Sequence, residues 1–142
     1  MDEDGPEDGT PIDRPVLNLL RDRLRTTDQV VAARITDESG HLELLVVFSE
    51  TYYPDPGTRA TLTVRWYTNG DFSVHYRETR PGDDWECRWD RHPNPHNHRE
   101  HFHPPPGAAT PGEDGSWPDD YREVIRLVLH EIEARIEQLW DA

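Results

Sequence analysis

The sequence predicts a single α+β domain, in which an antiparallel sheet of about five strands in meander order packs against one long helix. Between residues 31 and 90, apolar residues form five short runs separated by turns rich in Gly, Pro, Asn and Asp. Most of these runs alternate apolar and polar residues, as strands joined by short turns do. From residue 121 to the C-terminus, apolar residues recur at helical spacing. One face of that helix is therefore expected to cover one face of the sheet.

The first 25 residues predict an acidic tail followed by a short helix. Residues 1–12 are acidic and contain Gly and Pro, so we expect a disordered tail there. The domain is expected to span residues 13–142. Asp13 is predicted to cap a short amphipathic helix that has Pro15 in its first turn and ends near residue 25.

The five predicted strands cover residues 31–35, 42–48, 62–66, 72–76 and 85–90. The turn at Asn69-Gly70 sets the register of one hairpin. A three-residue loop with Gly70 in the left-handed conformation pairs Trp66 with Phe72, which keeps apolar side chains on one face. A two-residue turn would mix the two faces, because a slip of one residue reverses every side chain.

Strand parity places a group of charged and imidazole side chains on the face away from this apolar surface. In the fifth strand, Trp85, Cys87 and Trp89 point one way, toward the core, and the residues between them point the other way. The polar face is therefore predicted to carry Arg65, His75, Arg77, Arg88 and Asp90.

A proline- and histidine-rich segment follows, which we expect to be an irregular loop over residues 91–116. It contains His92, His96, His98, His101 and His103, together with prolines at 93, 95 and 104–106. Proline lacks an N–H group and restricts φ, which disfavours a helix or a central strand. We expect this loop to fold over the polar face. Ser116 and Asp119 are then predicted to form a capping box that starts the long helix.

The amino-acid composition indicates the solvent in which the protein works more than the reaction it performs. The 142-residue chain has 29 acidic residues against 15 arginines and no lysine, which gives a net charge of −14. This pattern is similar to that of haloarchaeal cytoplasmic proteins, whose surface charge is screened by molar salt. The acidic balance argues against broad DNA binding. A single cysteine, an acidic N-terminus and no long apolar run predict a cytoplasmic protein without a membrane segment.

Two chemical interpretations compete for the histidine segment. In one, the segment cleaves RNA without a metal: His96, His101 and His103 are the acid and base candidates, and Asp90 orients one imidazole. Arg88 would stabilise the charge on the phosphorane, and the substrate-binding candidates are Arg77, His75 and Arg65. In the other, zinc or nickel binds His96, His98, His101 and His103.

A third interpretation is a stiff surface loop whose histidines only pack and form hydrogen bonds. His92 precedes a proline and is the weakest member of the cluster. In the C-terminal helix, Arg122, Arg126 and Arg135 alternate with glutamates and are expected on a solvated face. Trp140, near its end, is a candidate contact for a homodimer.

Three short motifs stand out in and just before this segment: Arg88-Trp89-Asp90, Pro95-His96 and His101-Phe102-His103. Together they resemble the motif of TumE-type toxins. The matched positions are Arg88, Asp90, His96, His101 and His103. The resemblance implies the toxin of a toxin–antitoxin pair, neutralised by a helix-turn-helix antitoxin, and leaves the toxic reaction open.

Together these observations predict a toxin-like protein that is a metal-independent endoribonuclease, with RNA and an antitoxin as partners. One alternative is a non-catalytic module that docks on a helix-turn-helix regulator through the sheet and the C-terminal helix. Another is a hydrolase that depends on a divalent metal.

Overall fold

The computed structural model describes residues 10–92 and 99–142. The helices are α1 (Arg14–Leu24), the short 3-10 helix η1 (Glu50–Tyr52) and α2 (Tyr121–Asp141). The strands are β1 (Val30–Thr36), β2 (Glu43–Phe48), β3 (Arg59–Trp66), β4 (Phe72–Arg80), β5 (Asp83–Arg91), β6 (Glu100–His103) and β7 (Glu113–Asp114). All seven strands join one antiparallel sheet in sequence order. The α+β class and the meander are confirmed, with two strands more than expected.

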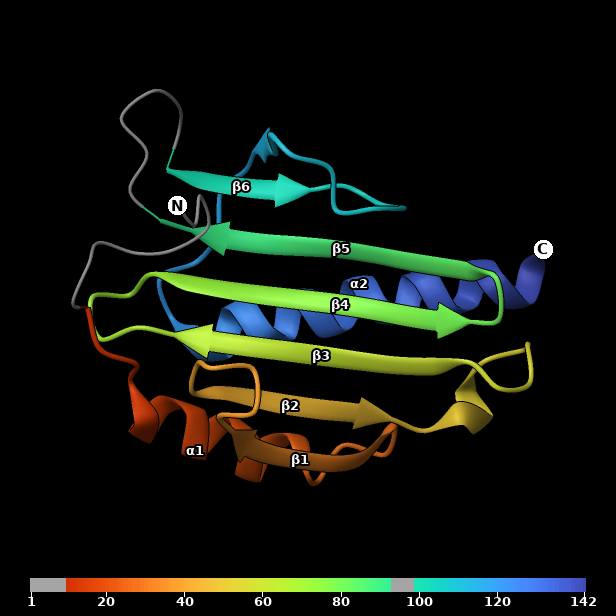
Figure 1. Cartoon of the computed structure of the whole chain (residues 1–142), viewed down its shortest axis with the longest axis horizontal. Coiled ribbons are helices and arrows are strands. Elements are labelled where there is room, and N and C mark those ends of the chain that lie inside the picture. The colour runs from red at the N-terminus through yellow and green to blue at the C-terminus, as the bar shows by residue number, and fades with distance from the viewer. Residues whose placement is uncertain (1–9, 93–98) are drawn as a thin grey trace.

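Both α1 and α2 pack on one face of the sheet. Figure 1 shows α2 running behind β3, β4 and β5, with α1 beside β1 and β2. The core between these layers includes Leu20 of α1, Val64 of β3, Val74 of β4 and Val128 of α2, all fully buried. Burying such apolar side chains is the main favourable contribution to folding. The opposite face, called the open face below, carries no helix from the described residues.

The predicted hairpin register is confirmed. Trp66 pairs with Phe72 and Val64 pairs with Val74, and the Trp66 and Phe72 rings stack with centroids 4.8 Å apart. Gly70 has a φ of 88°, which glycine adopts without a steric penalty. Every side chain of β3 and β4 therefore lies on its expected face.

The N-terminal helix begins where the sequence predicts, because the Asp13 carboxylate accepts a hydrogen bond from the Val16 N–H at 3.2 Å. Described residues within the predicted tail contact the sheet. Ile12 pairs with Tyr67 as a β-bridge, and the Pro11 carbonyl accepts a hydrogen bond from the Thr68 N–H. The rest of the predicted tail, residues 1–9, lies outside the described residues.

The expectation of an irregular loop over residues 91–116 is wrong in part, because β6 and β7 lie within it. In β6, Phe102 faces the core and contacts Trp89 of β5, with ring centroids 5.5 Å apart. This apolar contact stabilises the pairing of β6 with β5, although the segment that contains β6 is strongly polar. The prolines at 104–106 follow the last residue of β6, which agrees with their inability to donate in a ladder.

The start of the long helix is also corrected. Asp120, and neither Ser116 nor Asp119, caps α2, because its carboxylate accepts from the Arg122 N–H at 2.8 Å. The preceding segment is held by the sheet instead. Arg91 donates to the carbonyls of Trp117 and Pro118 at 3.1 and 2.7 Å, which keeps these residues out of the helix.

Arg135 does not lie on a solvated face, contrary to expectation. It donates hydrogen bonds to both carboxylate oxygens of Glu78 at 2.9 and 3.2 Å, and its guanidinium lies over the Trp85 ring. Glu78 is fully buried and also accepts from the Tyr76 hydroxyl. A buried carboxylate on the core face of β4 therefore requires a cation from α2.

Cys87 offers a direct test of this packing. The cysteine is buried among core residues, and this burial raises the pKa of its thiol to about 12. Because the thiolate is the reactive form, we expect the folded protein to resist alkylation by iodoacetamide at pH 8. Mass spectrometry should show labelling within minutes once denaturant unfolds the chain. Rapid labelling of the folded protein would contradict the buried position.

In the described part of the chain, no helix combines the length and the apolar character needed to cross a membrane.

Candidate functional site

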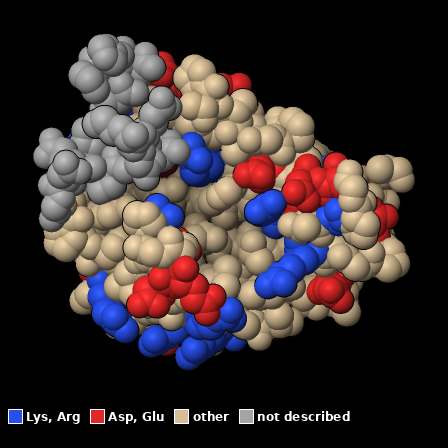
Figure 2. Space-filling model, viewed as in Figure 1, with Lys and Arg blue, Asp and Glu red and all other residues tan. Residues whose placement is uncertain are grey.

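The pairing of β4, β5 and β6 aligns the predicted site residues in two rows across the open face. In one row Ser73 lies opposite Asp90, and Asp90 lies opposite His101. In the next row His75 lies opposite Arg88, and Arg88 lies opposite His103. Directly opposed side chains in an antiparallel pair share a face and contact each other. Figure 2 shows this face of the molecule, where arginine and acidic side chains are interspersed.

Asp90 is the centre of the site and is fully buried. Its two carboxylate oxygens have different neighbours. Oδ2 lies 2.8 Å from His103 Nε2 and 3.4 Å from Arg88 Nε. Oδ1 faces two other imidazoles, with His101 Nδ1 at 3.4 Å and His92 Nε2 at 3.7 Å. One buried carboxylate thus organises three histidines and an arginine.

His103 is held at both ring nitrogens. Its Nδ1 lies 3.0 Å from the Ala109 carbonyl, and its Nε2 contacts Asp90. Carbonyl and carboxylate oxygens are acceptors, so both nitrogens donate and the ring is an imidazolium. Burial opposes this charge, but the hydrogen bond and negative charge of Asp90 outweigh it and raise the pKa of His103. In this arrangement His103 orients Asp90 and has no lone pair left to accept a proton.

His101 is arranged differently. Its Nδ1 points toward Asp90 Oδ1, and its Nε2 is buried with no hydrogen-bond partner among the described residues. Asp90 therefore favours the tautomer with hydrogen on Nδ1, which leaves a lone pair on Nε2. A buried imidazole in this state is suited to accept a proton from a bound ligand.

His92, which the sequence ranked lowest in the cluster, lies inside the site. It is buried, and its ring centroid is 5.3 Å from that of His101. The alternation of side chains along a strand could have predicted this position of His92. Arg88, Asp90 and His92 are two residues apart, so an extended chain places all three on the same face.

Each of the three substrate-binding candidates already has a carboxylate partner on the open face. Arg65 contacts Glu43 at 3.0 Å, His75 contacts Glu86 at 2.8 Å, and Arg77 contacts Asp84 at 3.0 Å. Burial lowers the pKa of His75, although Glu86 opposes this, so the ring is neutral near pH 7. A ligand that uses these side chains must compete with the acidic partners.

Two members of the predicted cluster, His96 and His98, lie outside the described residues. The four-histidine metal set therefore stays a prediction. Within the described ranges, a different group of potential ligands comes together: Asp90, His92 and His101, all buried, each with one ligand atom within 4.8 Å of the others. A carboxylate and two imidazoles are chemically able to bind a transition metal.

The comparison with protein families found a match. A family model described as Toxin TumE matches residues 16–136, which cover most of the chain. The chain belongs to the TumE toxin family. The match extends over all seven strands, so the Asp90 cluster lies inside the region typical of TumE proteins. Among curated proteins and solved structures, none matches the chain significantly.

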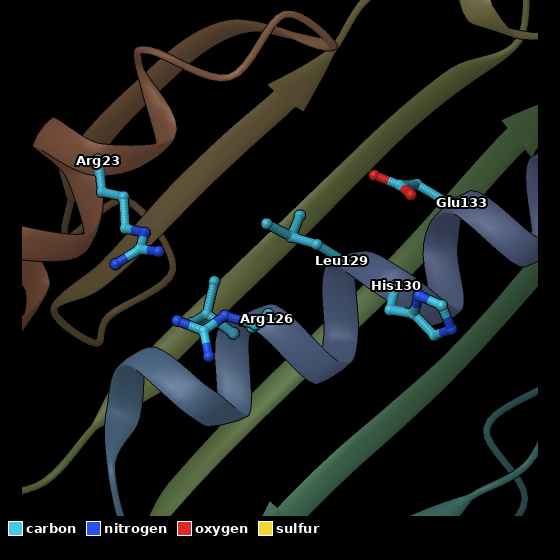
Figure 3. Close-up of a pocket in the computed structure, with 6 residues that line it drawn as sticks. Arg23, Arg126, Leu129, His130 and Glu133 are labelled. Atoms are coloured by element: carbon cyan, nitrogen blue, oxygen red, sulfur yellow. The ribbon is translucent and has the colours of Figure 1, made fainter.

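This TumE family member also has a groove that does not include the residues of the Asp90 cluster. It lies between α1 and α2, on the face of the sheet that the helices cover (Figure 3). Its lining comprises Arg23 of α1 and Ile125, Arg126, Leu129, His130 and Glu133 of α2. Because the sheet separates this groove from the Asp90 cluster, the two cannot act on one small ligand.

Proposed function

We propose that this chain is the toxin of a toxin–antitoxin pair and that it cleaves RNA without a metal. The single observation that supports this reaction is the Asp90–His101 pair beside Arg88. The pair offers an oriented imidazole with a lone pair, and Arg88 places a guanidinium 3.4 Å from the same carboxylate. A base and a cation at this spacing suit an internal attack on a phosphodiester.

The reaction would proceed within one RNA strand. His101 Nε2 takes the proton of a ribose 2′-hydroxyl, and the 2′-oxygen forms a bond to the adjacent phosphorus. The bond from phosphorus to the 5′-oxygen breaks, and that oxygen leaves with a proton from a second histidine, which acts in its imidazolium form. Among the described residues we assign this second role to His92, whose ring lies beside that of His101, and His96 is the other candidate. The products are a 2′,3′-cyclic phosphate and a 5′-hydroxyl.

The neighbouring charges support the same assignment. Arg88 and the imidazolium of His103 lie on the Oδ2 side of Asp90, and both would attract a phosphate. Arg88 is less buried than Asp90 and lies next to His75 on the open face. Bidentate hydrogen bonding by a guanidinium would stabilise the charge of the pentacoordinate phosphorus.

We further propose that a helix-turn-helix antitoxin neutralises the protein. The TumE family assignment supports a dedicated inhibitor. A short helix-turn-helix reading frame beside the gene would identify the candidate. Co-expression of both chains should yield a complex that co-purifies in molar salt and shows no RNA cleavage.

The decisive experiment is induced expression in a haloarchaeal host, followed by mapping of RNA ends. We expect growth arrest and RNA fragments with 5′-hydroxyl ends. Treatment of the purified protein with EDTA should leave cleavage unchanged. Normal growth together with intact RNA would refute the proposal.

One observation favours a second candidate function. Since Arg65, His75 and Arg77 are all engaged by carboxylates, these predicted substrate-binding side chains have little uncommitted positive charge for RNA. The chain would then be a module that binds the regulator without catalysis. An inert protein that still co-purifies with a helix-turn-helix partner would support this alternative.

A further inference from the structure

The geometry points to a binding site for one transition-metal ion, formed by Asp90, His92 and His101. Asp90 Oδ1 lies 3.4 Å from His101 Nδ1 and 3.7 Å from His92 Nε2. A tetrahedral ion about 2.1 Å from each ligand atom separates those atoms by roughly 3.4 Å. The ligand atoms of the three side chains all lie within 4.8 Å of one another, so side-chain rotations would bring them around a common ion.

A buried oxygen that lacks a hydrogen-bond partner among the described residues also supports the site. Asp90 Oδ1 is buried and has no hydrogen-bond partner among the described residues. Leaving a buried carboxylate oxygen without a partner is costly, and coordination to a cation would remove that cost. The other oxygen, Oδ2, already accepts from His103, which is itself fixed by the Ala109 carbonyl. A ligating carboxylate with such an outer hydrogen bond is the usual arrangement at metal centres.

The ligand set indicates which metals fit. Two imidazoles and one carboxylate suit zinc, nickel or copper, whereas magnesium and calcium prefer oxygen ligands. Three protein ligands also leave a position for water, unlike a closed structural zinc site. The positive charges of Arg88 and His103 on the far side of Asp90 oppose a cation. Only metals with strong nitrogen affinity should therefore bind.

Occupancy would change the state of His101, and this consequence rests on the proposed ribonuclease function. A metal on Nδ1 displaces the proton of Nδ1, so the neutral ring carries its hydrogen on Nε2. That nitrogen then donates and can no longer accept a proton from the 2′-hydroxyl. The ion also occupies Asp90 Oδ1. Zinc or nickel is thus an inhibitor of the metal-free reaction and not its cofactor.

The test is calorimetric titration of the full chain, made without a histidine tag and stripped with EDTA, in molar KCl. Zinc chloride and nickel chloride should each bind one ion per chain, and magnesium chloride should give no binding. His92→Phe, which keeps a ring of similar size, should abolish zinc binding. His130→Ala, on the exposed face of α2, is the matched control and should bind as the wild type does.

A second measurement distinguishes the loss of the metal site from misfolding of a variant. Zinc should raise the melting temperature of the wild type and of His130→Ala, and it should leave that of His92→Phe unchanged. Absence of stoichiometric zinc binding by the wild type, or wild-type affinity in His92→Phe, would overturn the site. Zinc binding by a protein that never cleaves RNA would instead refute only the proposed function and its inhibition.

Discussion

Replacing His101 with glutamine is expected to abolish growth arrest in an expressing host. Removing a general base typically costs about 10²- to 10⁴-fold in rate, and RNA cleavage by the purified variant should fall within that range. The reason is geometric. His101 Nε2 is the buried ring nitrogen without a hydrogen-bond partner in the described part of the chain, while Asp90 is placed to orient the opposite nitrogen. End-labelled RNA and single-turnover conditions would measure the loss directly.

His130→Gln is the matched control for this experiment, because His130 is exposed on α2 and remote from the cluster. It should cleave RNA as the wild type does. Glutamine at position 101 retains polar groups in the buried site, so the melting temperature in high salt should change little. If His101→Gln cleaves RNA at the wild-type rate, His101 is not the base.

Replacing Glu78 with alanine is expected to be among the most destabilising single changes. Glu78 is fully buried and binds Arg135, whose side chain is only 16% exposed. Removing one partner of a buried ion pair costs about 3–5 kcal/mol, because the other charge stays in the interior without compensation. For a domain of this size, that corresponds to a fall in melting temperature of roughly 10 °C. Urea unfolding followed by circular dichroism would measure the loss.

Two controls separate the ion pair from other effects. Glu137→Ala removes an exposed carboxylate from the same helix as Arg135 and should change stability by less than about 0.5 kcal/mol. Glu78→Gln preserves an acceptor for the Tyr76 hydroxyl, so its loss should be smaller than that of alanine. Equal stability of Glu78→Ala and Glu137→Ala would show that the buried pair contributes nothing.

Local patterns predicted the features that depend on neighbouring residues. The position of Gly70 and the parity of Trp66 and Phe72 were enough to set the hairpin register. Asp13 was recognisable as a cap because a cap acts within one turn of its helix. The same parity placed Arg88 and Asp90 on one face of β5. These features follow from spacing, and spacing is visible in a sequence.

Contacts between distant residues were not predictable in this way. The prolines around the histidines suggested an irregular loop. In the structure Phe102 packs against the Trp89 ring, and this contact stabilises β6 as a strand of the sheet. Arg135 looked like a surface residue because its partner, Glu78, lies 57 positions away. Neither pairing leaves a periodic signal in the chain.

The sequence by itself therefore determined the α+β class, the order of the first five strands and the group of residues that share the open face. Only the tertiary structure decided how the imidazoles divide their roles. Asp90 presents one oxygen to His103 and the other to His101 and His92. That division depends on the pairing of β5 with β6 and on the carbonyl of Ala109. These segments meet only in the folded chain, so the spacing of residues in the sequence does not reveal the contacts between them.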